Sequence, residues 1–432
     1  MRAGFAKVAI TPPIGTAMMG YGDRDRAHGC EGIHDELFVR AVFVAHAGEE
    51  ALIAGFDLCF LGREEADRFK GAIGRKIDLS PRQILLNTSH NHAGPSVGTW
   101  AYADYRPPDR MYLHELEKAV VTAACGASSC AREVALWAGS TRCALPMNRR
   151  RRDKDGSIRL APNPEGRVYD AVPLLVLKSL DGSPVSVLFS VSCHPTTLDG
   201  FEISADYPGV AMDLLDKHLG TSASLFLQGV GADANPCVVG DCEDEWRGGS
   251  WEDVARAGAM VAEPVALALE AGLVPMEPEI HCACVESQWP LAPSIGRAGY
   301  EALLAKPDTN ELMRLWAGRQ IARLERGKEL PTRVPVTAQG MQIGRGVRLI
   351  GLEGEPVAEL GLLIRDFCEE GVTFPLGCTN GAQLYLPTSD MLDEGGYEVE
   401  SYYEYGHPAP LAKGLEGIVR DALEHLRASG VT

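Results

Sequence analysis

Two histidines, His90 and His92, lie one residue apart in the segment LLNTSHNHAGPS. The apolar residues before them predict a strand, and a strand of period two would turn both imidazole rings to one face. The Gly-Pro pair at 94–95 would end that strand just beyond the rings. Because neutral imidazole is the commonest metal ligand, the pair indicates a metal site. The alternative is a polar turn whose side chains satisfy only nearby backbone groups.

Four other apolar runs also end in a side chain that could bind a metal. Asp57 follows ALIAGF, His194 follows VLFSVSC, Asp233 follows LFLQGVGA and Glu355 follows VRLIGLEG. Strand ends meet at one edge of an α/β sheet, so these loops are expected to converge. Taken singly, each of these residues is more often structural. Together, two histidines and a carboxylate are a usual zinc set, and a catalytic zinc leaves a position for a water whose pKa falls toward ~7.

Short apolar runs bounded by Gly, Pro or Asp alternate with longer helix-forming segments along the chain. Helices are predicted at 64–77, 111–127, 209–219, 310–326 and after the capping residue Ser250. Strands are predicted at 7–11, 38–48, 51–57, 134–138, 172–178, 185–191, 223–229, 334–344, 347–354 and 357–366. Since the order is mixed, we expect an α/β fold of mixed β-sheets flanked by helices, with the metal site at strand ends. At 432 residues the chain could hold two or three average domains, although no repeat or low-complexity linker divides it.

The composition is that of a globular protein, with 45% hydrophobic and 23% charged residues. A formal net charge of -18 argues against nucleic-acid binding, which requires an extended basic face. The one basic run, NRRRRDK, is short, and Arg150, Arg151 and Arg152 are expected in a solvated loop. The chain has no apolar run of ~18 residues that could span a membrane and no signal-peptide core at its amino terminus. We therefore expect a cytoplasmic protein without stable membrane insertion. Its twelve cysteines show no paired framework, which in the cytoplasm means reduced thiols.

Several short motifs follow one another in a fixed order. They are AITPP near the start, GIHDEL at 32–37, SHNHAGP at 89–95, NRR from Asn148, CHPT from Cys193, GEP from Gly354 and a late pair of tyrosines. Each is weak alone, but in this order they resemble the neutral ceramidase superfamily of zinc amidases. The resemblance covers nearly the whole chain, and it implies that residues 1–432 form a single catalytic domain like that of a short bacterial-type member. It implies a hydrolase that uses Zn2+ to cleave a linear amide bond.

The same resemblance implies roles for individual residues. Four residues look like the zinc ligands: His90, His194, Glu355 and Tyr385. A phenol, with a usual pKa near ~10, can bind as an anion once a dication lowers that value. His92 corresponds to a histidine beside the substrate amide, and its expected task is proton transfer. Tyr397, twelve residues after Tyr385, matches a tyrosine that helps hold the substrate oxygen, and Arg149 matches an active-site arginine.

Two departures from the family pattern bear on the mechanism. The ceramidases carry a serine in a Gly-Asp-x-Ser-Pro-Asn segment, whereas this chain reads GADANPC and places Asn235 at the serine position. A side-chain amide cannot attack a carbonyl, which leaves a zinc-bound water as the expected nucleophile and Asn235 as a hydrogen-bonding group. The carboxy-terminal β-domain of the family also has no counterpart before Thr432.

These departures favour a small soluble N-acyl compound as the substrate, such as an N-acylated amino sugar or amino alcohol, with a ceramide-like lipid second. Two alternatives remain open. A zinc-dependent esterase would pass through the same kind of tetrahedral intermediate. A non-catalytic, metal-stabilised binding protein would need no nucleophile, although His92, an imidazole that the metal does not need, favours an enzyme.

Overall fold

The computed structural model describes residues 1–22, 24, 28–98, 108–240, 244–368 and 370–432. Within them, the largest sheet has the strand order β12-β10-β9-β6-β1-β3-β4-β5, with β14 beside β6. Most neighbours are antiparallel, whereas β4 with β5 and β10 with β12 run parallel. Its strands are β1 (Arg2–Ala9), β3 (Phe38–His46), β4 (Glu49–Phe56), β5 (Ile84–Thr88), β6 (Arg132–Arg142), β9 (Ala171–Ser179), β10 (Pro184–Val191), β12 (Ser224–Gln228) and β14 (Val274–Met276).

A second, smaller sheet packs face to face with the first. One buried cluster joins Val42, Leu85 and Leu225 of the first sheet to Met341 and Phe374 of the second. The smaller sheet has the order β15-β16-β17-β19, in which only β17 and β19 run parallel. Its strands are β15 (Pro278–Pro290), β16 (Arg333–Gly344), β17 (Val347–Leu352) and β19 (Val372–Leu376).

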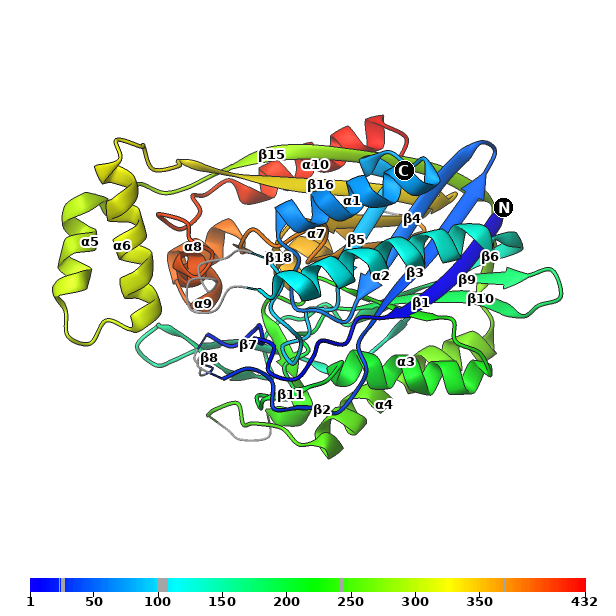
Figure 1. Cartoon of the computed structure of the whole chain (residues 1–432), viewed down its shortest axis with the longest axis horizontal. Helices are drawn as coiled ribbons and strands as arrows, with labels where there is room; N and C mark the ends of the chain where they lie inside the picture. The colour runs from blue at the N-terminus through cyan, green and yellow to red at the C-terminus, as the bar shows by residue number, and fades with distance from the viewer. Residues whose placement is uncertain (23, 25–27, 99–107, 241–243, 369) are drawn as a thin grey trace.

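Helices cover the outer face of each sheet, so the layers follow the order helix, sheet, sheet, helix (Figure 1). In β3, Val39 and Ala41 pack toward helices, whereas Val42 and Val44 pack toward the smaller sheet. Because both faces are covered, the central strands read as continuous apolar runs. The covering helices are α1 (Arg63–Ile77), α2 (Arg110–Ser129), α3 (Asp206–Leu219) and α4 (Trp251–Ala271) on the larger sheet, and α7 (Ala358–Cys368) and α10 (Leu415–Ala428) on the smaller one.

Short elements complete the structure. The β15–β16 hairpin extends beyond its sheet and carries two helices at its tip, α5 (Gly296–Ala305) and α6 (Glu311–Glu325) (Figure 1). Three small strand groups are β2 (Gly32–Ile33) with β11 (Glu202–Ile203), β7 (Pro146–Arg152) with β8 (Ile158–Asn163) and β13 (Ala234–Pro236), and β18 (Glu355–Pro356) with β20 (Tyr385–Leu386). Two short helices, α8 (Ser389–Glu394) and α9 (Tyr397–Glu400), precede α10.

The carboxyl ends of several parallel strands meet at one end of the two sheets. Asn87, in β5, accepts a hydrogen bond from the backbone N–H of Gln228 at 2.7 Å and donates one to the carbonyl oxygen of Gly377 at 2.8 Å. Gln228 ends β12 and Gly377 follows β19, so one buried amide ties three strand ends together. The loops that continue from this end carry the candidate site.

The predicted fold class, an α/β fold of mixed sheets flanked by helices, is confirmed. The helices predicted at 64–77, 111–127, 209–219 and 310–326 correspond to α1, α2, α3 and α6, and the Ser250 side chain caps α4. The strand predicted at 357–366 is wrong, because these residues lie almost entirely in α7. Leu360 and Ile364 are spaced for one helical face, and the Asp233 carboxylate caps the helix by accepting from the N–H of Ala358 at 2.9 Å.

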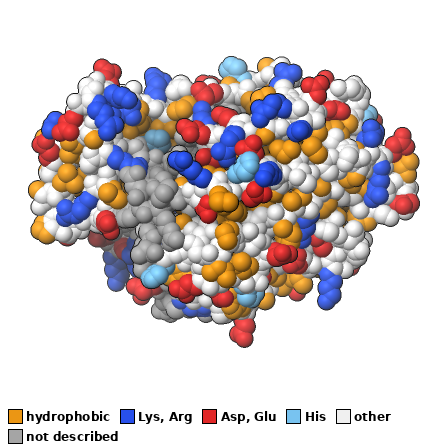
Figure 2. All heavy atoms as spheres, in the orientation of Figure 1, with side chains coloured by type: hydrophobic (Ala, Val, Ile, Leu, Met, Phe, Trp, Pro, Cys, Tyr) orange, Lys and Arg blue, Asp and Glu red, His pale blue; other side chains and the backbone are white. Residues whose placement is uncertain are grey.

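The solvated loop predicted for the basic run is also wrong. Arg150, Arg151 and Arg152 continue strand β7, and Arg150 is buried. Its guanidinium donates to Glu398 at 2.6 Å and to Glu394 at 3.2 Å, so partners elsewhere in the chain compensate its charge. On the face drawn in Figure 2, acidic and basic side chains are interspersed. No helix in the described ranges is long and apolar enough to cross a bilayer.

Asp57, one of the strand-end carboxylates, has a structural partner. It accepts from Arg40 at 2.8 and 2.9 Å and from the N–H of Phe38 at 2.8 Å, and both charged side chains are buried. Asp57→Ala leaves the Arg40 charge unpaired, and we expect the free energy of unfolding in urea to fall by about 3–5 kcal/mol. Glu277→Ala, which removes the exposed ion pair with Arg345, is the control and should change stability little. Equal unfolding midpoints for the two variants would contradict this role of Asp57.

Candidate metal centre

The loop after β5 places His90 and His92. Strand β5 ends at Thr88, and His90 adopts a left-handed backbone conformation with φ of 64°. The prediction that a strand turns both rings to one face is therefore wrong. The two rings nevertheless approach each other, and their Nε2 atoms lie 3.2 Å apart. The intervening Asn91 fixes this loop by donating to the carbonyl oxygen of Ser204 at 2.6 Å and accepting from the N–H of Ala93 at 2.8 Å.

Four buried donor groups converge from separate loops. The Nε2 atoms of His90 and His194 lie 3.1 and 3.3 Å from Oε2 of Glu355. The hydroxyl of Tyr385 lies 3.3 Å from Nε2 of His194. Each of these side chains is at most 5% exposed, and β18 and β20 hold Glu355 beside Tyr385 as parallel neighbours. The structure thus brings together the four residues that the sequence analysis assigns to a metal.

Backbone carbonyls orient the two imidazoles. Nδ1 of His194 lies 2.7 Å from the carbonyl oxygen of Gly231, and Nδ1 of His90 lies 3.3 Å from that of Cys59. A proton on each Nδ1 satisfies these contacts and leaves each Nε2 with a lone pair. Burial, together with the nearby charge of Arg149, lowers the pKa of His194 to about 4, so this ring is neutral at pH 7.

This arrangement is unfavourable without a cation. Oε2 of Glu355 is buried and accepts no hydrogen bond from the described residues. It faces the Nε2 lone pairs of His90 and His194, so partial negative charges would meet in a site that water does not screen. A metal ion among the donor atoms converts that repulsion into coordination. The donor set therefore fits a bound divalent cation.

Arg149 lies beside the donor set. Its guanidinium donates to the hydroxyl of Tyr385 at 3.1 Å, to Oδ1 of Asn235 at 3.2 Å and to the carboxylate of Glu398 at 2.9 Å. Burial raises the pKa of Tyr385 well above its usual value, and the Arg149 charge opposes that effect. Arg149 is thus placed to stabilise negative charge on Tyr385 and to fix the orientation of Asn235.

His92 lies beside the four-residue set and does not belong to it. Tyr21 packs edge-on against its ring at 5.0 Å, and a Cβ on Gly20 would approach the ring to 2.6 Å. Gly20 also has φ of 120°, which favours glycine. Burial, followed by the neighbouring imidazoles, lowers the pKa of His92 well below its usual value, and its Nδ1 has no hydrogen-bond partner among the described residues. With Cys59 and His90 it also forms an alternative group within reach of a metal.

The remaining predicted residues divide between the site and its support. Tyr397 packs against Tyr385 at 5.6 Å and donates its phenol proton to Glu404 at 3.0 Å. Asp233 lies behind Asn235, where it accepts from Ala358 and from the Asn148 side chain. Asp57 and Asp233 are therefore structural anchors and lie outside the two candidate ligand groups.

Two nearby residues escaped the sequence analysis. Glu398 pairs with both Arg149 and Arg150, and Tyr405 donates to Oε1 of Glu355. Neither lies at the end of an apolar run. Tyr405 is one of three tyrosines in SYYEYG, and the sequence offers no signal that separates it from the other two.

Comparisons with known proteins identify the fold. No protein-family model matches the sequence, and no curated protein matches it. Among solved structures, a ceramidase complexed with C2 matches with a TM-score of 0.74 and 15% identity over 99% of this chain and 75% of that one. The neutral ceramidase from Pseudomonas aeruginosa matches with a TM-score of 0.74 and 17% identity over 99% of this chain and 74% of that one. The chain has a ceramidase-like fold, and the predicted resemblance is confirmed at this level.

The metal centre makes a prediction about two glutamates that are two residues apart. Glu355→Gln removes the negative charge that faces both imidazoles, so we expect bound divalent metal to fall sharply in elemental analysis after dialysis against a chelator. Glu353→Gln is the matched control, because Glu353 is equally buried but is bound by Arg63. It should keep the metal. Equal metal content in Glu355→Gln and the parent would refute the centre.

Proposed function

We propose that residues 1–432 form a single catalytic domain that uses zinc to hydrolyse the amide bond of an N-acyl compound. The observation that carries the proposal is the buried set of His90, His194, Glu355 and Tyr385 with a further imidazole, His92, at its edge. The ceramidase names of the two similar structures support an amide substrate.

Zinc is the metal that the donor distances favour. A zinc ion about 2.0–2.1 Å from each donor would need neighbouring donors roughly 3.3 Å apart. Three of the six separations within the set are 3.1, 3.3 and 3.3 Å, which is compatible with zinc. Two imidazoles, a carboxylate and a phenolate are also ligands that zinc accepts. When bound beside these four side chains, zinc would take a water as a fifth ligand, lower the pKa of that water toward ~7 and polarise a carbonyl group.

His92 is the proposed proton carrier. Amide hydrolysis adds water to the carbonyl carbon, breaks the C–N bond and requires a proton on the departing nitrogen. The Nε2 atom of His92 lies nearest the donor set, 3.2 Å from Nε2 of His90. Since burial keeps this ring neutral, Nε2 can take a proton from the attacking water and deliver it to the leaving amine.

Asn235 and Arg149 are the proposed polar contacts for the substrate carbonyl. Oδ1 of Asn235 already accepts from Arg149, so the amide N–H groups are the part of Asn235 that can donate to a developing oxyanion. Because an amide side chain is no nucleophile, water is the attacking group. Tyr397 is proposed to hold the substrate oxygen, which requires its phenol proton to leave Glu404.

The substrate class is part of the same proposal. We place a small soluble N-acyl compound first and a ceramide-like lipid second, because Asn235 replaces the serine of the ceramidase pattern. We also place the protein in the cytoplasm, which the free thiols of the described cysteines support.

A substrate panel tests the proposal. The zinc-loaded protein should release carboxylic acid from at least one member of a panel that includes N-acyl amino sugars, N-acyl amino alcohols and short-chain ceramides. Release from O-acyl compounds alone would identify an esterase. A zinc-bound protein that releases acid from neither class would be a metal-stabilised binding protein, and the proposal would be wrong.

Replacing His92 separates proton transfer from metal binding. His92→Ala should keep its zinc while amide hydrolysis falls by about 100- to 10,000-fold. The loss should be smaller for an activated ester, whose leaving group needs no proton. Zinc content and both rates are measured in one preparation, with His218→Ala, a half-exposed histidine, as the control. If zinc disappears together with activity, His92 is a ligand and the four-residue set is wrong.

Replacing Asn235 tests the nature of the nucleophile. Asn235→Ala should lower kcat by about 10- to 1000-fold, the range for loss of one donor to an oxyanion, because water remains to attack. Mass spectrometry of the parent during turnover should detect no covalent acyl-enzyme. A trapped acyl group on any side chain would rule out direct attack by water.

A further inference from the structure

Glu355 is held from both sides. Its Oε2 atom faces the imidazoles of His90 and His194, whereas its Oε1 atom accepts a hydrogen bond from the hydroxyl of Tyr405. The last torsion of a glutamate side chain is soft, so a free carboxylate could rotate and offer either or both oxygens to a metal. The phenol occupies Oε1 and leaves Oε2 alone to face the imidazoles.

We propose that Tyr405 is a positioning residue that holds Glu355 as a ligand through one oxygen, and that the α5–α6 helices hold Tyr405 in place. The inference rests on the proposed metal centre. Hydrogen-bond partners of ligating carboxylates commonly set their orientation and affect metal affinity. Tyr405 is placed for this task, because its ring packs between Phe60 at 6.2 Å and Tyr385 at 6.0 Å.

The segment after Tyr405 is attached to the helical hairpin at its backbone. Three consecutive carbonyl oxygens, those of residues 406, 407 and 408, accept hydrogen bonds from side chains of α5 and α6. The donors are Gln320 at 3.1 Å, Trp316 at 2.8 Å and Tyr300 at 3.0 Å. Trp316 and Tyr300 are almost fully buried, and the bond from Tyr300 is buried as well, whereas the other two are partly buried.

Aromatic packing reinforces this attachment. Trp316 packs against Tyr300 at 5.2 Å, Tyr402 at 5.8 Å and Tyr403 at 6.0 Å. The two helices thus contact the chain on both sides of Tyr405. They lie at the tip of the β15–β16 hairpin, away from the stacked sheets (Figure 1). The helical hairpin is therefore connected to the proposed ligand Glu355 through the backbone of residues 406–408 and the side chain of Tyr405.

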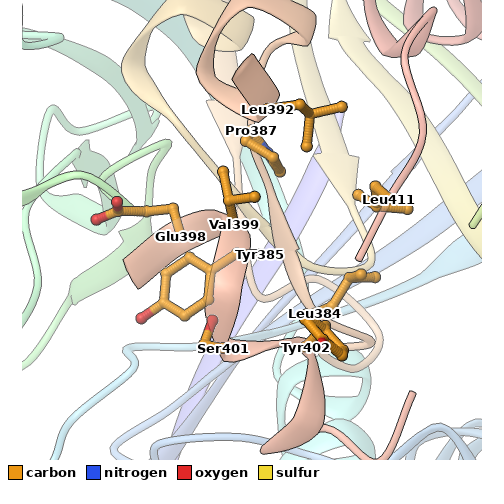
Figure 3. Close-up of a pocket in the computed structure, with 9 residues that line it drawn as sticks. All are labelled: Leu384, Tyr385, Pro387, Leu392, Glu398, Val399, Ser401, Tyr402 and Leu411. Atoms are coloured by element: carbon orange, nitrogen blue, oxygen red, sulfur yellow. The ribbon is translucent and has the colours of Figure 1, made fainter. Parts of the chain in front are cut away.

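Tyr402 provides a matched control. Figure 3 shows it with Tyr385, Glu398, Ser401 and Leu411 around a small pocket behind the site. Tyr402 packs against the same Trp316, and within the described ranges the hydrogen bond from a phenol to Glu355 comes from Tyr405, not from Tyr402. Tyr402→Phe therefore removes a phenol hydroxyl from the same segment without affecting the carboxylate.

The experiment compares zinc affinity in the parent, Tyr405→Phe and Tyr402→Phe by competition with a chromophoric chelator. We expect the apparent dissociation constant of Tyr405→Phe to rise about 10- to 100-fold and that of Tyr402→Phe to stay at the parent value. With cobalt(II) in place of zinc, Tyr405→Phe should also lose visible absorption, because a second carboxylate oxygen raises the coordination number. Metal-free parent and variants should unfold at similar temperatures.

A double-variant cycle tests the role of the helices. Trp316→Phe removes the indole N–H that donates to residue 407, so it should weaken zinc binding in the parent background. It should have little further effect in the Tyr405→Phe background if both changes act through one carboxylate. Additive losses would overturn the part assigned to the helices.

The outcomes separate the two proposals. If the parent binds no zinc, the metal centre and the role of Tyr405 both fail. If the parent binds zinc and Tyr405→Phe matches Tyr402→Phe in affinity and in the cobalt spectrum, the role of Tyr405 fails while the metal centre stands.

Discussion

The site depends on one electrostatic constraint, namely that a buried carboxylate oxygen faces the Nε2 atoms of two imidazoles and accepts no hydrogen bond from the described residues. Glu355 supplies the oxygen, and the carbonyls of Cys59 and Gly231 keep the protons of His90 and His194 on the far sides of their rings. A divalent cation among these atoms would turn that contact into coordination. The stacked sheets place these groups in one buried volume, because parallel strands end together and a single amide, Asn87, ties three of the ends.

Charge around the donor set is balanced as well. A dication would meet a carboxylate at Glu355 and a phenolate at Tyr385, and beyond them Arg149 pairs with Glu398. Burial alone raises the pKa of the Glu398 carboxyl, and the charges of Arg149 and Arg150 more than offset that effect. The guanidinium that supports Tyr385 thus has its own counter-ion, which is why an arginine can lie so close to a metal site.

The sequence predicted the parts of this structure that local chemistry determines. Strand-end residues pointed to His90, His194 and Glu355, and the resemblance to ceramidases added Tyr385. The parts it missed depend on contacts distant in sequence. The left-handed turn at His90 depends on contacts around its loop. The first turn of α7 is capped by Asp233, more than 120 residues earlier. Arg150 is paired, in its buried position, with carboxylates about 240 residues away. Tyr405 contacts Glu355 across 50 residues of sequence, and helix α6 donates a hydrogen bond to the segment that follows it.

The most direct test of the central claim is an anomalous difference map at the zinc edge, from crystals of the protein grown with zinc. The account predicts one strong peak per chain, bounded by Nε2 of His90, Nε2 of His194, Oε2 of Glu355 and the hydroxyl of Tyr385. A peak between Cys59 and His92, the alternative group, would move the metal to the other side of His90. No peak at either place would contradict the claim that this buried cluster exists to bind a metal.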